Sequence, residues 1–377
     1  MRVLILGWEF PPAKTGGLGT HCYELVRNLG INGVRVLLFI PKRSETVKHN
    51  LQNVEITDVG MALSNPYNPK TSFEKGYGWN FLDEVETYNK KCVALALTKN
   101  FDLIHCHDWI TIPAGIELKK RTGKPLVFTV HSTEYDRTIN IYPSRKIIDI
   151  EKKGNDKADS IIAVSKNIKQ QLIRNYEADE RKIRVIYNGI DHSKFFGITK
   201  KGYKNIVLFL GRLTTQKGPS FFLQAAKKVL EKKSDVLFVI SGQGEKLPGL
   251  IRETFDLGIM DHVVFTGYLS EEELIRAYEI AAVYVMTSVA EPFGITALEA
   301  IASGTPVIVS KNAGVTERIH HCFKIDYWNT SDIANKIIGV LRYSVLRDCM
   351  RKNAFKELEN LSWDGVAEQT IEVYRRF

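Results

Sequence analysis

The chain alternates short apolar runs, rich in β-branched residues, with longer stretches in which apolar and polar residues mix. Glycine, asparagine or proline bounds most of the short runs, as is typical of buried strands. Strands that alternate with helical stretches predict βαβ units and a parallel sheet. The first series of expected strands comprises Val3–Leu6, Val34–Ile40, Leu103–His105, Leu126–Val130 and Ile161–Val164.

A second series of apolar runs begins after Phe195–Asn205, a lysine- and glycine-rich stretch with neither strand nor helix periodicity. Such a stretch is typical of a linker, and 377 residues exceed what one hydrophobic core usually covers. We therefore predict an α/β protein with one Rossmann-like domain over residues 1–195 and a second over residues 205–362. The second series of strands comprises Ile206–Leu210, Val236–Ile240, Val263–Thr266, Val283–Met286 and Val307–Val309.

Composition narrows the class of protein. Apolar residues make up 44% of the chain and charged residues 25%, which is typical of a globular protein. The apolar run in Met1–Gly7 is too short for a signal peptide or a membrane span. The 5 cysteines are scattered and never spaced as CxxC, which argues against a disulfide scaffold or a zinc knuckle. We expect a cytoplasmic protein.

The net charge of +9 fits nucleic acid, anionic lipid or a phosphate-bearing substrate as a partner. The basic residues are spread along the chain, and no RNA-binding aromatic motif or finger spacing is present. We therefore expect no nucleic-acid partner.

Glycines cluster between the first expected strand and a helix around Tyr23–Leu29, in a segment that includes Gly16, Gly17 and Gly19. Backbone N–H groups and the positive end of the helix dipole favour an anion at such a turn. The spacing is not GxGxxG, so it does not indicate a dinucleotide. A flexible turn without a ligand remains the alternative.

Histidines follow two expected strands of the first series. His105 and His107 share one face of a strand, and His131 ends the next strand. A metal site needs three or four convergent ligands, and no further His/Cys cluster is near in sequence, so we favour a site without metal. His107 and Asp108 would then point into the crevice where open α/β sheets bind ligands. A hydrogen-bonded strand end without ligand contacts remains the alternative.

The second half carries a cationic loop and two acidic residues. Arg212 and Lys217 follow the strand Ile206–Leu210, in a loop suited to a diphosphate. Glu291 lies in a Pro/Gly turn, and Glu299 lies on the helix that follows. Carboxylates suit sugar and ribose hydroxyls, whereas exposed helix amides suit phosphate. Solvated surface charges are the alternative for all four residues.

These motifs together resemble the retaining GT-B glycosyltransferases, which include family 4 and the glycogen and starch synthases. Glu291 and Glu299 match the E-x₇-E signature, and the resemblance covers nearly the whole chain. Further matching segments, in the family's order, are Val185–Asp191, Gly211–Gly218 and Ser241–Gly244. The resemblance implies two Rossmann-like domains whose parallel sheets face a central cleft. It also implies that Trp363–Phe377 crosses back to the first domain.

Two N-terminal segments narrow the resemblance to enzymes that elongate glucans. Lys14–Leu18 resembles the KTGGL loop of glycogen and starch synthases, and His107–Trp109 resembles their HDW segment. The chain has Phe293 where the bacterial synthases usually have cysteine, and it is more compact. The acceptor therefore stays open between a glucan and a lipid-linked or small-molecule acceptor.

The resemblance implies a role for each site residue. Arg212 and Lys217 would bind the donor diphosphate and replace a metal ion, in agreement with the absence of Asp-x-Asp from the chain. Glu299 would hold the ribose, Glu291 the transferred sugar, and His131 would contact that sugar from the opposite domain. Further donor contacts are implied for Lys14, Gly16, Gly17, Gly211, Phe293, Gly294, Ile295 and Thr296.

His107 and Asp108 would belong to an acceptor or sugar pocket. The partners implied are a nucleotide sugar, which is a substrate, and a glycan; no cofactor is implied, and the oligomeric state is open.

Docking of a glycolipid-forming enzyme on a membrane would use the basic segment Tyr135–Lys153. A sugar-binding module without activity would lack charged site residues that are present here. An NAD-dependent dehydrogenase is disfavoured because neither half carries GxGxxG.

Overall fold

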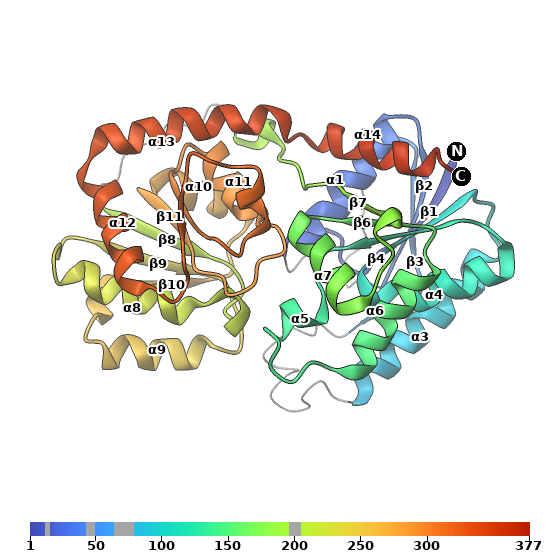
Figure 1. Cartoon of the computed structure of the whole chain (residues 1–377), viewed down its shortest axis with the longest axis horizontal. Helices are drawn as coiled ribbons and strands as arrows, with labels where there is room; N and C mark the ends of the chain where they lie inside the picture. Colours follow the sequence, from blue (N-terminus) through green and yellow to red (C-terminus); the bar gives the residue numbers. More distant parts are fainter. Residues whose placement is uncertain (12–15, 43–49, 64–78, 196–204) are drawn as a thin grey trace. The chain divides into compact units, whose positions relative to one another are not determined.

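The computed structural model describes residues 1–11, 16–42, 50–63, 79–195 and 205–377, which form two compact units (Figure 1). The first unit comprises Met1–Gly189 together with Trp363–Phe377, and the second comprises Ile190–Ser362. The division therefore falls a few residues before residue 195, where the sequence places the end of the first domain. Most of the predicted linker lies outside the described residues.

The first unit is built on a parallel sheet of seven strands in the order β3-β2-β1-β4-β5-β6-β7. The central strands β1, β4 and β5 are almost fully buried, as expected where helices cover both faces of a parallel sheet. The strands are β1 (Arg2–Leu6), β2 (Arg35–Ile40), β3 (Val54–Asp58), β4 (Leu103–His107), β5 (Leu126–Val130), β6 (Ser160–Ala163) and β7 (Ile183–Val185).

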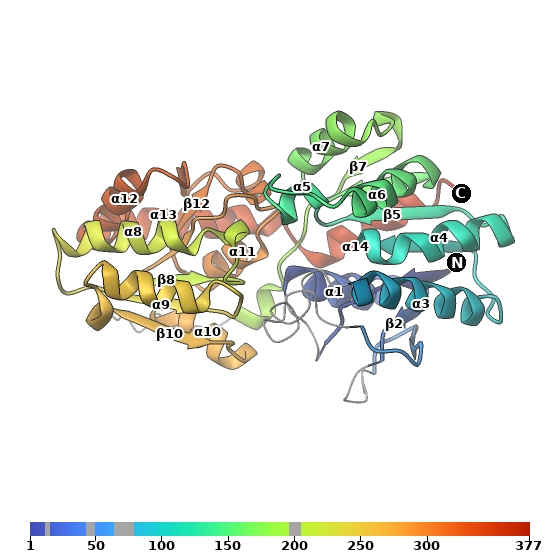
Figure 2. The same ribbon diagram turned by 90° about the horizontal axis from the view of Figure 1, so that it is seen from below.

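Two layers of helices cover this sheet. The helices are α1 (Gly17–Ile31), α3 (Trp79–Ala96), α4 (Asp108–Thr122), α5 (Glu134–Arg137), α6 (Arg145–Lys157), α7 (Lys166–Tyr176) and α14 (Trp363–Tyr374). Helix α4 packs between α3 and α6, whereas the C-terminal helix α14 packs on α1 (Figures 1 and 2). The chain proceeds from β1 to β3 toward one edge of the sheet and from β4 to β7 toward the other, so right-handed crossovers place helices on both faces.

The second unit repeats the architecture with six parallel strands in the order β10-β9-β8-β11-β12-β13. The strands are β8 (Ile206–Leu210), β9 (Leu237–Ser241), β10 (Val263–Gly267), β11 (Val283–Met286), β12 (Val307–Ser310) and β13 (Phe323–Ile325). The helices are α8 (Pro219–Leu230), α9 (Leu247–Asp256), α10 (Glu271–Ile280), α11 (Ile295–Ala302), α12 (Thr330–Arg342) and α13 (Ser344–Glu357). Phe209, Phe222 and Phe238 pack in its core, between the sheet and α8, with tilted and edge-to-face rings.

The predicted fold class of two parallel α/β domains is confirmed. All ten expected strands are present, although several begin or end one or two residues from the predicted bounds. Three further strands, β3, β7 and β13, were missed. Strand β3 lies at the edge of its sheet and is only partly buried, while β7 and β13 span three residues each. Edge position and short length both remove the apolar pattern on which prediction depends.

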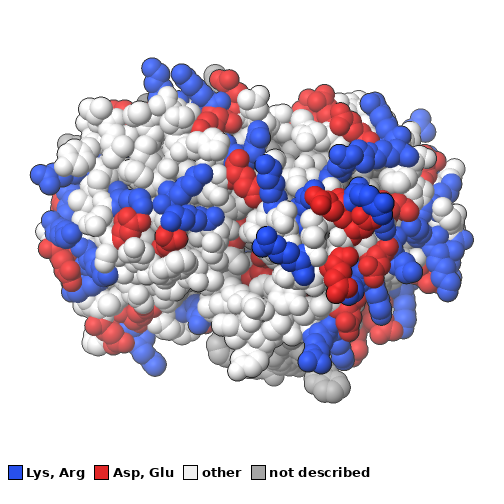
Figure 3. Space-filling model, in the orientation of Figure 1, with Lys and Arg blue, Asp and Glu red and all other residues white. Residues whose placement is uncertain are grey.

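The surface carries charges of both signs. On the face drawn in Figure 3, lysine and arginine side chains alternate with aspartate and glutamate and form no continuous basic stripe. Among the described residues, no helix is both long and apolar enough to cross a membrane.

Candidate functional site

A lysine and a glutamate meet at the carboxyl ends of β8 and β11 in the second unit. Lys217, at the end of the 3₁₀ turn η3 (Thr215–Lys217), places its Nζ 2.6 Å from Oε2 of Glu291. Ser288 donates to the same oxygen at 3.1 Å. The two charged side chains are mostly buried, with relative exposures of 19% and 9%. The strands β8 and β11 are neighbours in the sheet, which is why residues so distant in sequence pair.

Glycines let three loops of the second unit approach one another closely. A Cβ atom on Gly218, where φ is +63°, would lie 2.3 Å from the Thr287 carbonyl oxygen. A Cβ atom on Gly242, where φ is +134°, would lie 1.9 Å from the carbonyl oxygen of Gly211. These loops also exchange backbone hydrogen bonds, including Val289 N–H to the Gln216 oxygen at 2.9 Å. The backbone that carries Lys217 is thus held against the backbone that leads to Glu291.

Helix α11 begins beside this pair. Gly294 precedes the helix with φ of +110°, and no side chain caps the helix start at Ile295. The N-terminus of a helix presents N–H groups and a positive dipole end, which suits a phosphate or a sugar oxygen. On the next turn, Glu299 accepts a hydrogen bond at 3.0 Å from the buried hydroxyl of Tyr278, which also donates to the Thr296 carbonyl. The direction of the Glu299 carboxylate is therefore set by α10.

The structure thus brings Lys217, Glu291, Gly294 and the start of α11 together, as the sequence places them. Glu299 follows one turn further along α11. Arg212 lies in the same loop as Lys217, with an Nη2 to Gln216 Oε1 distance of 3.5 Å. Their roles toward a ligand stay predictions. The direct contact between Lys217 and Glu291 was not foreseen, because the sequence assigns them to different parts of the donor.

In the first unit, four histidines gather at the carboxyl ends of β4 and β5. His107 Nδ1 lies 3.0 Å from His131 Nε2, and the two rings are stacked. His21 from α1 lies edge-on to His131, with ring centroids 4.4 Å apart. His105, one pleat before His107, is fixed by Tyr374 and Thr129 on its two ring nitrogens. The sequence argument against convergent histidines was wrong, because it counted neighbours along the chain and missed His21.

Asp108 holds the loop of His131. Its Oδ1 accepts from the backbone N–H of His131 at 2.7 Å and of Ser132 at 3.4 Å. Asp108 takes φ of +57°, a conformation that is uncommon outside glycine. His107 is fully buried and Asp108 is 5% exposed, so the hydrogen-bonded strand end, which the sequence left open, describes Asp108 well. A pocket role for the two residues stays a prediction.

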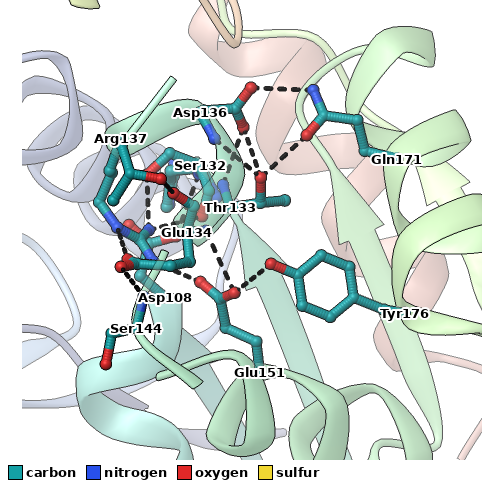
Figure 4. A network of polar contacts seen from close by, with 12 residues as sticks. Asp108, Ser132, Thr133, Glu134, Asp136, Arg137, Ser144, Glu151, Gln171 and Tyr176 are labelled. Carbon is teal, nitrogen blue, oxygen red and sulfur yellow. Dashed lines mark hydrogen bonds and ion pairs between the residues drawn. The ribbon is translucent and has the colours of Figure 1, made fainter. Parts of the chain in front are cut away.

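A buried polar network fixes the segment after His131 (Figure 4). Thr133 and Asp136 form a capping box at α5, and Gln171 from α7 bonds to both side chains at 2.8 Å. Arg137 pairs with Glu134 at 3.2 Å and with Glu151 of α6. The Tyr176 hydroxyl donates to Glu151. The loop that carries His131 is therefore anchored to both α6 and α7.

This network buries one of the five cations of the predicted membrane-docking segment, Tyr135–Lys153, whose role stays a prediction. The Arg137 side chain is only 5% exposed because its guanidinium pairs with two buried carboxylates. It is therefore not available to a lipid surface. The sequence shows the positive charge of Arg137 but not that its partners, Glu134 and Glu151, are buried in the fold.

Several site neighbours were missed by sequence reasoning. Asn188 accepts a hydrogen bond from His21 Nδ1 at 2.8 Å. It lies in the matched segment Val185–Asp191, but sequence reasoning assigned it no role at the site. Trp363 and Tyr374, both on α14, contact His21 and His105 respectively. The one signal for His21 in the sequence was its position, directly after the glycine turn and at the start of the helix. Lys14 lies outside the described residues, Gly16 precedes α1, and Gly17 begins it.

Comparison with known proteins agrees with this architecture. Residues 15–194 match the family model described as Glycosyltransferase Family 4, and residues 191–357 match Glycosyl transferases group 1. An uncharacterized glycosyltransferase of Methanocaldococcus jannaschii is 34% identical, over 100% of this chain and 98% of its own. The chain belongs to the family 4 and group 1 glycosyltransferases.

Two further likenesses place this glycosyltransferase among its relatives. A glycogen synthase of Mycobacterium tuberculosis is 26% identical, over 99% of this chain and 94% of the relative. The solved structure of HepE from Anabaena, in complex with UDP and glucose, superposes with a TM-score of 0.79 at 18% identity and covers 100% of both chains. The two-unit fold is thus the GT-B fold, as the sequence predicts.

The buried histidines make the stability of this glycosyltransferase depend on pH. Burial, the largest cause, lowers the pKa of His21 to about 4, of His105 to about 3, and of His107 and His131 well below 6.5. Below pH 6.5 the unfolded chain therefore binds more protons, and stability present above that pH is lost as the pH falls toward 4. Burial raises the pKa of Asp108 to about 7, which acts in the opposite direction.

Burial also raises the pKa of Glu134, but four histidines outweigh the two carboxyl groups of Asp108 and Glu134, so acidification should destabilise the first unit. Each net proton changes the free energy of unfolding by about 1.4 kcal/mol per pH unit. We expect hydrogen exchange of β4 and β5 amides, corrected for the intrinsic rate and measured with EDTA present, to be faster at pH 5.5 than at pH 7.5. Equal protection at both values would contradict the assignment of these rings as buried and neutral.

Proposed function

We propose that this protein is a retaining glycosyltransferase that moves a hexose, glucose from UDP- or ADP-glucose, to a glucan acceptor. The observation that carries the donor part is the pairing of Lys217 with Glu291 beside the uncapped start of α11. A cation, a carboxylate and helix amides side by side match the three parts of a nucleotide sugar that need recognition. These are the diphosphate, the sugar hydroxyls and the leaving oxygen.

The geometry supports different roles for Lys217 and Glu291 in donor binding. An ammonium group has three N–H donors, and Lys217 directs one of them to Glu291. The other donors can reach a phosphate, where they would offset the charge that grows as the nucleotide leaves. Both contacts to Glu291 fall on Oε2, so Oε1 can accept from a sugar hydroxyl. Glu291 would thereby orient Lys217 and the sugar at once.

The remaining residues complete the proposed reaction. Arg212 would bind the diphosphate, and Glu299, oriented by Tyr278, would hold the ribose hydroxyls. His131 would contact the transferred sugar from the first unit. Retention would proceed on one face of the sugar, with the leaving phosphate accepting the proton of the acceptor hydroxyl. The bond between the anomeric carbon and the phosphate oxygen breaks while the bond to the acceptor oxygen forms.

Glucose and a glucan are proposed on the combined strength of two observations. The M. tuberculosis relative is named a glycogen synthase, and the HepE structure contains UDP and glucose. The burial of Arg137 removes one cation from the segment that a membrane-docking enzyme would use. A lipid-linked or small-molecule acceptor is the second choice.

A donor screen in EDTA tests the proposal. UDP-, ADP- and GDP-glucose and their galactose and mannose counterparts are each incubated with glycogen, maltooligosaccharide, a polyprenyl phosphate or no acceptor, and released nucleotide is measured. We expect turnover with one glucose donor and a glucan, undiminished by EDTA, because Arg212 and Lys217 would offset the phosphate charge in place of a metal ion. Turnover restored only by added divalent metal would refute metal independence. Turnover with the lipid alone would replace the glucan.

A further inference from the structure

Three histidines of the first unit converge in the arrangement of a metal site. His21 comes from α1, His107 from the end of β4, and His131 from the loop after β5. One ring nitrogen from each lies within 4.8 Å of the others. Within the part of the chain that the structure describes, no other group of three or more histidine, cysteine or acidic side chains has such geometry. All three belong to one compact unit.

Asn188 fixes the tautomer of His21. Its Nδ1–H donates to Asn188 Oδ1 at 2.8 Å, which leaves Nε2 without a proton. That Nε2 is buried and has no hydrogen-bond partner. A histidine whose other nitrogen donates to an oxygen acceptor is the usual arrangement around bound metal ions, because the acceptor fixes the tautomer and the ring orientation.

His107 and His131 present a second pair of nitrogens. Their Nδ1 and Nε2 atoms are 3.0 Å apart, so one nitrogen must carry a proton that faces the lone pair of the other. His107 Nε2 is buried and unpartnered, so the economical tautomer has the proton on His107 Nδ1. A zinc ion between the two rings would displace this proton, which would move to His107 Nε2, so that His107 Nδ1 and His131 Nε2 could both coordinate. Bonds of ~2.0–2.1 Å place the ligand nitrogens of a tetrahedral zinc site ~3.3 Å apart, close to the 3.0 Å between these two atoms.

We propose that His21, His107 and His131 form a binding site for one divalent transition-metal ion of the zinc class. Three imidazoles suit Zn²⁺, Cu²⁺, Ni²⁺ or Co²⁺, whereas Mg²⁺ and Ca²⁺ require oxygen ligands. Three protein ligands leave a fourth position for water. His131 is the least buried of the three, which places this position on its side. His105 is excluded from the ligand set because Tyr374 and Thr129 occupy both of its nitrogens.

The ion would act as an inhibitor of transfer. This step rests on the proposed function, in which His131 contacts the transferred sugar. A metal ion on His131 takes the nitrogen that would reach the sugar hydroxyl and adds positive charge beside the reacting centre. Zinc should therefore compete with the nucleotide sugar, and EDTA should relieve the inhibition. Catalysis itself would remain independent of metal.

Equilibrium dialysis against Zn²⁺, with metal quantified by mass spectrometry, tests the site without reference to activity. We expect one tightly bound zinc per chain. His21→Gln, which can still donate to Asn188, should weaken binding at least tenfold, and Asn188→Ala should weaken it by ~10–100-fold. The matched control is His105→Gln, which removes a neighbouring histidine from the same strand face but should bind zinc as the parent does.

Spectroscopy on the unaltered protein covers the case in which a variant does not fold. Cobalt-loaded protein should show the intense visible absorption of a four-coordinate Co²⁺ site, displaced by one equivalent of Zn²⁺. Equal zinc binding by the parent and His21→Gln, or less than about one fifth of an equivalent in the parent, would overturn the site. Zinc bound without loss of transfer would overturn the inhibition. Absence of transfer with every donor would refute the proposed function and leave the zinc stoichiometry to decide the site.

Discussion

Replacement of Lys217 by alanine is expected to lower kcat by ~10²-fold or more while the fold survives. The ammonium is needed most as negative charge develops on the leaving phosphate, so its loss weakens the transition state more than the bound donor. The side chain lies against Glu291, which orients it before the donor arrives. Steady-state kinetics of nucleotide release give the ratio of kcat values, and Lys227→Ala on α8 serves as a charge-matched control.

The neighbouring carboxylates should fail differently. Glu299→Ala should mainly raise KM for the donor, because ribose hydroxyls are bound alike in the ground and transition states. Glu291→Ala should lower kcat and reduce discrimination between hexose epimers, since it would remove the proposed sugar contact and would release Lys217. Because Lys217 and Glu291 are in contact, the Lys217→Ala/Glu291→Ala double variant should lose less activity than the sum of the two single losses. If all three single variants stay within twofold in kcat/KM, about 0.4 kcal/mol, the donor site is wrong.

A second large effect is expected from Gly242→Ala in the loop after β9. The added Cβ atom would lie 1.9 Å from the Gly211 carbonyl oxygen, and φ of +134° is a conformation that alanine rarely adopts. Backbone strain and overpacking together predict a loss of about 3–5 kcal/mol in the free energy of unfolding of the second unit. Chemical denaturation followed by circular dichroism measures this loss.

Gly249→Ala provides the matched control for this substitution. Gly249 lies inside α9, and a Cβ atom there would meet no atom within 4 Å. Alanine is the better helix former, so this variant should gain up to ~1 kcal/mol in stability. A Gly242→Ala variant as stable as the parent would mean that the loops after β8 and β9 are not held in contact.

The parallel sheets could be predicted because their buried strands are continuous apolar runs. Strands such as β1, β5 and β8 stand out from the glycine and polar residues that bound them. The edge strand β3 could not be recognised in the same way. It has one neighbour among the described strands and none of its side chains is fully buried, so its composition resembles that of a loop.

The residues of the candidate site could be predicted from the sequence, but the contacts between them could not. Arg212, Lys217 and Glu291 were found because charged residues follow strands whose carboxyl ends share one edge of a parallel sheet. The pairing of Lys217 with Glu291 depends on β8 lying beside β11, and the order of strands in a sheet is not written in the spacing along the chain. His21 was missed for the same reason: its partners lie on β4 and after β5.

We expect the sugar of a nucleotide donor to be transferred with its anomeric configuration retained. Proton NMR of the first minutes of reaction tests it most directly, with the donor identified in the screen and maltooligosaccharide as acceptor. The expected result is a new anomeric signal with the α configuration of the donor, which grows in step with free nucleotide diphosphate and is nearly absent with Lys217→Ala. A β-configured product, or nucleotide release without a new glycoside, would contradict it.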